Sequence, residues 1–179
     1  FNISKEKYNE YKTIKYAKLM LKKHEKKHGI NNGEVYFVPS NIEKVSHMQM
    51  KDILIKFGFD KVFIINGDGC IIYEPENEPY DINLYSDINS EISKKLGDFY
   101  LQNNLNEEKI AITGHNCIMR GITLNSPKML LTHAIISPKF KNPDNIYQLV
   151  GRMFGNIKKF DIYREKFTEK KQIIICNQY

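Results

Sequence analysis

Short apolar runs alternate with longer segments of helical spacing along this chain, and this alternation restricts the fold more than any other feature. The apolar runs lie at residues 34–38, 61–65, 109–113, 129–137 and 172–176. The helical segments lie at residues 5–27, 41–57, 89–104 and 142–155. Strands that are apolar on both faces are typical of a parallel sheet covered by helices on each side. The pattern predicts a three-layer α/β fold with a mostly parallel sheet, preceded by an N-terminal helix.

The N-terminal segment 5–27 lacks Pro and Gly and reads as one basic helix. Its apolar residues at helical spacing are Tyr8, Tyr11, Ile14, Ala17 and Leu21. Its lysines around that stripe are Lys12, Lys15, Lys18, Lys22, Lys23, Lys26 and Lys27. Either the lysines bind nucleic acid, or the stripe packs on the domain while the lysines stay solvated. The second arrangement is the more common, so we expect a helix within residues 1–32 that packs on a domain formed by residues 33–179.

The bulk composition excludes several classes of protein. No apolar run reaches the ~20 residues of a membrane span, and no signal-peptide pattern opens the chain, so no membrane partner is expected. The three cysteines form no C-x-x-C pair, which fits a reducing, intracellular setting and predicts no zinc site. The net charge of +6 favours a polyanionic partner. Because the chain starts at Phe1, we expect it to be a piece of a longer protein.

Small, hydroxyl-bearing or Gly residues follow three of the predicted strands. These residues are Ser40 after the first strand, Asn66 and Gly67 after the second, and Thr113 and Gly114 after the third. Right-handed crossovers place the loops after parallel strands along one edge of the sheet, where ligands bind. Such residues let backbone N–H groups approach phosphates closely. Each one alone is most often a plain turn, but together they predict a phosphate-binding edge.

The predicted helix 142–155 contains Gln148 and Arg152, which share a helix face because they are four residues apart. The planar guanidinium of Arg is always charged and grips phosphate oxygens two at a time. An amide and a guanidinium on one face point to nucleotide chemistry. The alternative is an ordinary helix Arg paired with a carboxylate.

From residue 33 to residue 176, the order of these segments resembles the C-terminal RecA-like lobe of superfamily-two helicases and translocases. Residues 36–40 and 63–67 are similar to the first two elements of that lobe. Residues 110–123 are similar to the motif that couples ATP to the nucleic-acid track, and residues 133–136 to the strand after it. The Gln-Leu-Val-Gly-Arg of residues 148–152 resembles the arginine-finger motif, the most specific of these matches.

One position departs from the family pattern. The family often has a second Arg three residues after Gly-Arg, and this chain has Gly155 there. A subset found in large DNA viruses and in some phage and bacterial ATPases has an aromatic or small residue and then Gly, which Met153-Phe154-Gly155 resembles. The departure leaves two candidates for the arginine finger, with Arg152 first and Arg120 second.

The resemblance implies a RecA-like lobe of the P-loop NTPase type and the function of a second motor lobe in an ATP-dependent helicase or translocase. The implied catalytic residues are Arg152 and Gln148. The implied ATP-binding residues are Arg120, Gly121 and Gly151. The implied contacts to the backbone of DNA or RNA are Ser40, Asn66, Gly67, Thr113 and Gly114.

The chain lacks a G-x-x-x-x-G-K-[ST] phosphate loop and an Asp-Glu pair at a strand end. ATP and Mg²⁺ are therefore expected to be held mainly by an N-terminal RecA-like lobe of the same protein, and this piece alone is expected to be inactive. No residue of this chain is expected to ligate a metal. Two other functions stay open: an inactive helicase-like lobe that serves as a nucleic-acid or protein platform, and a stand-alone nucleotide enzyme that uses the turn at residues 66–69.

Overall fold

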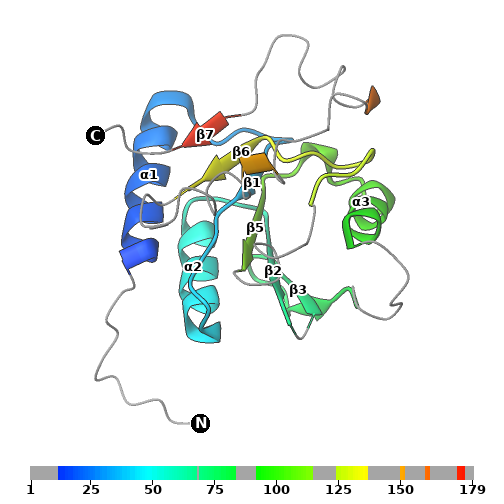
Figure 1. The fold of residues 1–179 in the computed structure, drawn as a ribbon, viewed down its shortest axis with the longest axis horizontal. Coiled ribbons are helices and arrows are strands. Elements are labelled where there is room, and N and C mark those ends of the chain that lie inside the picture. Colours follow the sequence, from blue (N-terminus) through cyan, green and yellow to red (C-terminus); the bar gives the residue numbers. More distant parts are fainter. Residues whose placement is uncertain are drawn as a thin grey trace.

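In the computed structural model, one sheet lies between helices on both of its faces (Figure 1). The structure describes residues 12–67, 69–83, 92–114, 124–136, 150–151, 160–161 and 173–175. The helices are α1 (Lys12–His28), α2 (Lys44–Lys56) and α3 (Ile92–Gln102), with a short 3-10 helix, η1 (Leu105–Glu107). The strands are β1 (Val35–Phe37), β2 (Lys61–Asn66), β3 (Gly69–Tyr73), β4 (Tyr80–Asp81), β5 (Ile110–Gly114), β6 (His133–Ile135) and β7 (Ile173–Ile175). Helices α1 and α2 cover one face, and α3 covers the other.

The sheet is mixed, with the strand order β4-β3-β2-β5-β1-β6-β7. Strands β2, β5, β1, β6 and β7 run parallel to one another, while β3 and β4 are antiparallel additions at one side. The expected α/β class is confirmed, but the sequence analysis missed β3 and β4. The turn at residues 66–69 leads straight into a second apolar run, which is a hairpin signal. Pairing of Asn66 with Gly69 closes that hairpin.

Most of the predicted segments coincide with observed elements, but the expected strand 129–137 is much shorter. Only His133–Ile135 joins the sheet. Before it, the backbone bonds to nearby side chains: the Leu131 N–H donates to Asn125 Oδ1 at 2.7 Å, and the Met129 N–H donates to Ser126 Oγ at 3.2 Å. Local partners of this kind replace a sheet ladder. The expected helix 142–155 falls outside the described residues except for positions 150–151, which are helical.

The central strands are buried on both faces, and their side chains alternate between two core clusters. Val35 and Phe37 of β1 pack with α3, whereas Tyr36 packs with α1 and α2. The same alternation divides β5, because Ile110 and Ile112 belong to the α3 side and Ala111 belongs to the opposite side. Full burial of a Val, Ile or Phe side chain contributes about 1.5–3 kcal/mol to the stability of the fold. Burial on both faces fixes which side chains point to each layer.

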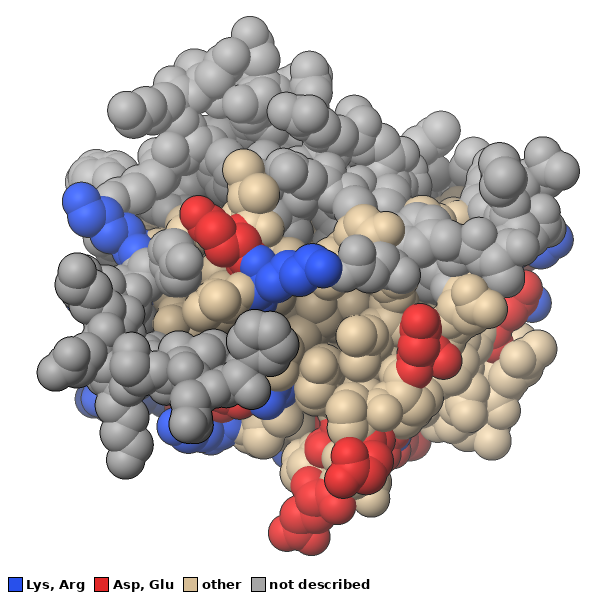
Figure 2. Space-filling model, turned by 90° about the horizontal axis from the view of Figure 1, so that it is seen from below, with Lys and Arg blue, Asp and Glu red and all other residues tan. Residues whose placement is uncertain are grey.

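Helix α1 lies along the sheet, antiparallel to β1. Near its start, the Thr13 hydroxyl donates to Asn41 Oδ1 at 2.5 Å, just beyond the carboxyl end of β1. Near its end, the His24 ring lies 5.9 Å from the Tyr36 ring. Its buried side chains are Ile14, Ala17, Met20, Leu21 and His24. Seen from below, lysine side chains are visible at the left of the molecule and near its centre, and several acidic side chains gather in the lower middle (Figure 2).

Helix α3 approaches the segment before β6 closely at Gly97. A methyl group added to Gly97 would lie 2.1 Å from Ser126 Oγ and 3.2 Å from Lys128 Cβ. Ser126 is buried and its hydroxyl accepts the N–H groups of Lys128 and Met129, so it cannot move without losing those bonds. The contact therefore requires glycine inside this helix.

We expect Gly97→Ala to lower the free energy of unfolding by about 1–2 kcal/mol, because overpacking outweighs the better helix propensity of alanine. Gly151→Ala is the matched control, since Gly151 is helical, exposed and has open space around it. The control should leave stability unchanged or raise it by up to about 1 kcal/mol. Urea unfolding measures both variants, and equal stability of the two would contradict the close packing of α3.

Candidate functional site at the carboxyl edge of the sheet

The sheet order brings three of the predicted ligand segments together at one edge. Strand β5 lies between β2 and β1, so the residues after all three strands are neighbours. Ile65 of β2 is in register with Gly114 of β5. On the other side, the Ser40 N–H donates to the Gly114 carbonyl at 3.2 Å. The segments at residue 40, residues 66–67 and residues 113–114 therefore form one contiguous edge, which we call the carboxyl edge.

The hydroxyl groups of Ser40 and Thr113 are buried at this edge. Ser40 is 2% exposed and Thr113 is 0% exposed. Among the described residues, neither hydroxyl has a hydrogen-bond partner. A buried polar group without a partner costs about 1–3 kcal/mol, so native proteins retain few of them. Neither hydroxyl reaches solvent in this structure, so direct contact with a phosphate requires local rearrangement.

The chain between Ser40 and α2 is held by short-range hydrogen bonds. The Ser46 hydroxyl lies 3.1 Å from the Asn41 carbonyl and 2.7 Å from the Glu43 carbonyl. The His47 ring nitrogen Nε2 lies 2.9 Å from the same Asn41 carbonyl. These bonds fix the entry into α2, whose N-terminal end therefore lies at the carboxyl edge.

Two glycines of the carboxyl edge differ in their surroundings. Gly114 is buried and has a φ of 148°, which a residue with a side chain rarely adopts. Gly67, in the β2–β3 hairpin, is exposed and has open space around it. The adjacent Asn66 is half-buried. Gly67 therefore offers exposed backbone at this edge, whereas Gly114 permits the turn after β5.

Most of the predicted nucleotide-contacting residues lie outside the described residues: Gln148, Arg152, Arg120 and Gly121. Gly151 is helical and exposed. The preceding Val150 is partly buried and packs against the core cluster on the α3 side of the sheet. The helix at residues 150–151 is therefore anchored on that face.

One buried polar residue of α2 was not singled out from the sequence. Gln49 on α2 is buried, and its Oε1 has no hydrogen-bond partner among the described residues. A Gln within a predicted helix gives no signal of its own, because most helical glutamines are solvent-exposed. Only the packing of α2 on the sheet distinguishes it.

A second polar cluster lies at the opposite, amino edge of the sheet. The Tyr36 and His133 rings are stacked with centroids 4.3 Å apart, and His24 of α1 packs edge-on against His133 at 5.1 Å. The ring nitrogen Nδ1 of His133 lies 2.9 Å from Thr132 Oγ1. His133 is a buried histidine with a polar partner. Burial, and then the nearby His28, lower the pKa of His24.

Glu34 links this cluster to the turn before β1. Its carboxylate accepts the Asn31 N–H at 2.8 Å, the Asn31 side-chain amide at 3.1 Å and the Tyr36 hydroxyl at 2.9 Å. Burial alone would raise the pKa of Glu34, but the Asn31 hydrogen bonds, the nearby His133 and the Tyr36 hydroxyl outweigh it and lower the pKa. The ionised carboxylate is thus the form that the fold stabilises.

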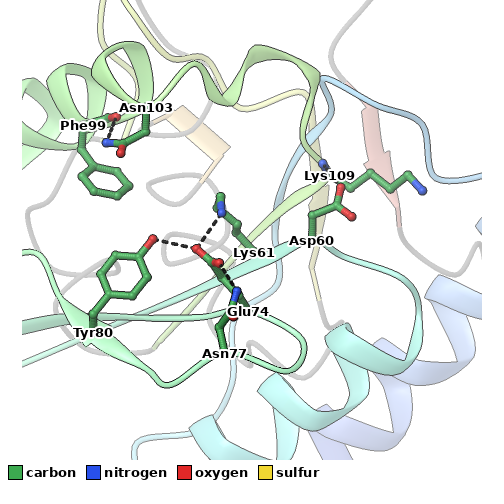
Figure 3. A network of polar contacts seen from close by, with 8 residues as sticks. All are labelled: Asp60, Lys61, Glu74, Asn77, Tyr80, Phe99, Asn103 and Lys109. Carbon is green, nitrogen blue, oxygen red and sulfur yellow. Dashed lines mark hydrogen bonds and ion pairs between the residues drawn. The ribbon is translucent and has the colours of Figure 1, made fainter.

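The β3–β4 connection is fixed by a third polar network (Figure 3). The Glu74 carboxylate accepts bonds from Lys61 Nζ at 2.6 Å, the Tyr80 hydroxyl at 2.8 Å and the Asn77 amide at 2.9 Å. Burial would raise the pKa of Glu74, yet these bonds lower it. The acidic segment 74–79 therefore closes a hairpin. The Tyr80 hydroxyl is part of this network.

Three further observations concern ligands and relatives. Within the described part of the chain, no three His, Cys, Asp or Glu side chains are grouped as a metal site would require. Of the helices that the structure describes, none is long and apolar enough to cross a bilayer. No protein-family model, curated protein or solved structure matches this chain.

We expect Glu34→Gln to lower the free energy of unfolding at pH 7 by about 1–2 kcal/mol, because charge-assisted hydrogen bonds are lost. The pKa of Glu34 is lower in the folded than in the unfolded protein. The stabilisation by its ionised carboxylate is therefore complete above about pH 4.5 and is lost as the pH falls through the folded pKa. The difference between variant and parent should thus narrow at acidic pH in urea unfolding. Glu43→Gln, at an exposed position, is the control and should stay within about 0.5 kcal/mol of the parent.

We expect Thr113→Val to leave stability unchanged or raise it by up to about 2 kcal/mol, because the variant removes a buried hydroxyl that lacks a partner among the described residues. Thr132→Val is the matched control. Thr132 Oγ1 accepts the Val35 N–H at 2.8 Å and donates to the Val35 carbonyl at 3.0 Å. Its loss should cost about 1–3 kcal/mol in urea unfolding. An equal loss in both variants would show that the Thr113 hydroxyl has an internal partner.

Proposed function

We propose that this chain is the second motor lobe of an ATP-dependent nucleic-acid helicase or translocase. In this proposal ATP and Mg²⁺ are held mainly by a first RecA-like lobe, and this lobe closes over the nucleotide. Opening and closing of the cleft moves the carboxyl edge relative to a DNA or RNA strand.

The observation on which the proposal rests is the strand order at the carboxyl edge. The segments at residues 40, 66–67 and 113–114 are distant in sequence but adjacent in the sheet. A phosphate backbone needs several donors along one line, and a row of strand ends supplies backbone N–H groups in that arrangement. Hydroxyl and amide donors suit phosphate oxygens, so the residues at this edge fit such a ligand.

The buried hydroxyls of Ser40 and Thr113 support the proposal in a second way. A protein can retain a polar group without an internal partner when that group serves a bound state. On closure of the lobe over its ligands, a shift of Ser40 after β1 and of Thr113 near the end of β5 would give both hydroxyls a phosphate partner. The energetic cost in the free protein would then be offset in the complex.

The assignment of Arg152 as the arginine finger depends on the Gln-Leu-Val-Gly-Arg pattern. A finger stabilises negative charge on the transferring phosphoryl group and increases the rate by about 10³–10⁵, or roughly 4–7 kcal/mol. In the proposed role Gln148, one turn earlier on the same helix face, positions the site. Arg120, with Gly121 and Gly151 beside the nucleotide, is the second candidate for the cation.

A non-enzymatic platform is the competing function. The Gly at position 155, where the family often has a second Arg, favours it. A platform would bind nucleic acid or protein without ATP turnover, so an ATPase assay on the intact protein separates the two functions.

Arg152→Ala in the intact protein, with its first lobe present, should lower kcat for ATP hydrolysis by about 10³–10⁵ and leave nucleic-acid binding nearly unchanged. The chain has only three arginines, so Arg120→Ala tests the second candidate and Arg164→Ala is the matched control. The control should retain turnover. Full turnover in the Arg152 variant, with loss in the Arg120 variant, would move the finger to Arg120. If the intact parent hydrolyses no ATP under stimulation by nucleic acid, the platform function replaces the motor.

A further inference from the structure

Helix α1 is a strongly basic segment of this protein. Helix α1 contains seven lysines and one acidic residue, Glu25, so its formal charge without the histidines is +6. The whole chain has 27 basic and 21 acidic residues and the same net charge of +6. The rest of the chain therefore has equal numbers of acidic and basic side chains. A helix with seven lysines and one acidic residue has the excess of positive charge that is typical of a polyanion-binding surface.

The fold presents these charges on one side of α1. The buried side chains of the helix pack in the core cluster with Tyr36, Val38 and Leu54. At about 100° per residue, the lysines occupy the opposite half of the helix, and all seven are exposed: Lys12, Lys15, Lys18, Lys22, Lys23, Lys26 and Lys27. We call this surface the lysine face. The sequence left open whether these lysines are only solvated, and the fold adds that they form a single outward surface.

The lysine face runs from the carboxyl edge to the amino edge of the sheet. Thr13 bonds Asn41 at the carboxyl edge, directly after Ser40, while His24 packs at the amino edge against His133. Figure 1 shows α1 as the outermost helix on its side of the sheet. A helix of 17 residues is about 25 Å long, which equals about seven base pairs at 3.4 Å each. The lysine face thus extends away from the candidate site by the length of a short duplex contact.

The chemistry of the surface favours nucleic acid over a membrane. A helix that binds a bilayer inserts its apolar face, and the apolar face of α1 is buried against the sheet. The lysine face itself has a single large apolar side chain, Leu19, which is 48% exposed. Single strands are bound by stacking on aromatic rings, and Tyr16, the aromatic residue of α1, is half-buried. A phosphate backbone requires only the charges that this surface presents.

We infer that the lysine face of α1 binds the phosphate backbone of a nucleic-acid duplex beside the carboxyl edge. The contact does not depend on the nucleotide sequence, because lysine ammonium groups bind phosphates and not base edges. This contact does not depend on ATP hydrolysis, so it can be tested independently of the motor function. In a motor, such a contact would hold the duplex ahead of or behind the strand at the carboxyl edge.

The test is the salt dependence of binding to a labelled DNA duplex of about 20 base pairs. A triple variant removes Lys15, Lys22 and Lys26, which lie along one line of the lysine face, by Lys15→Gln, Lys22→Gln and Lys26→Gln. Each phosphate contact contributes about 0.9 to the slope of log K against log salt. The slope should therefore decrease by 2 to 3, so the affinity lost between about 50 and 200 mM salt should shrink by about 40-fold.

The matched control makes the same charge change away from α1, by Lys56→Gln, Lys94→Gln and Lys109→Gln. Its slope should stay within about 1 of the parent, and urea unfolding should show that both triple variants are folded. Arg152→Ala, which tests ATP turnover, should leave the slope unchanged, so failure of the motor function and failure of this inference give different results. Equal slopes for the two triple variants would overturn the inference. It would also be overturned if the α1 variant lost binding to phosphatidylserine vesicles while its duplex binding matched the control.

Discussion

The pairing of β5 between β2 and β1 is the interaction on which the rest of this structure depends. These three strands are separated in the sequence by α2, α3 and the β3–β4 hairpin, and they become neighbours only when their apolar side chains are buried on both faces. Burial on two faces leaves no freedom in the register, because a slip of one residue would exchange the two cores. The same pairing sets Ser40 beside Gly114 and places the end of β2 on the other side of Gly114. The carboxyl edge is thus a consequence of core formation, and its polar groups lie where the hydrophobic pairing leaves them.

Polar groups in this protein have two kinds of environment. At the amino edge and in the β3–β4 connection, carboxylates and hydroxyls are matched to donors and acceptors. Glu34, Glu74 and Thr132 each have two or more partners, and the pKa values of both carboxylates are lowered against the effect of burial. At the carboxyl edge the hydroxyls of Ser40 and Thr113 are buried without such partners among the described residues. The matched networks stabilise the free protein, whereas the two buried hydroxyls contribute little to its stability. It is the physical reason for placing the candidate site at the carboxyl edge.

The charge distribution on α1 depends on which side of the helix is packed against the core. Helix α1 is attached through one apolar side, so its opposite side is free of packing constraints and accommodates seven lysines. Their mutual repulsion is tolerated because the apolar contacts of the helix anchor it along its length and water screens the charges. The excess of charge on this rigid helix gives a partner a linear surface with a fixed position relative to the carboxyl edge. Spread over the whole molecule, the same charge would produce weaker and less oriented attraction.

The sequence by itself determined the α/β class, the position of most helices and strands, and the amphipathic character of α1, because these follow from the period of apolar residues along the chain. It also identified which residues follow each strand. It did not reveal β3 and β4, since a hairpin depends on pairing between two runs, nor the short extent of β6, where Asn125 and Ser126 bond the backbone that would otherwise join the sheet. Only the tertiary structure decided that residues 40, 66–67 and 113–114 are neighbours, that two hydroxyls there are buried, and that the lysines form one outward face. Strand order, burial and surface are properties of packing between distant segments, and local periodicity contains no information about them.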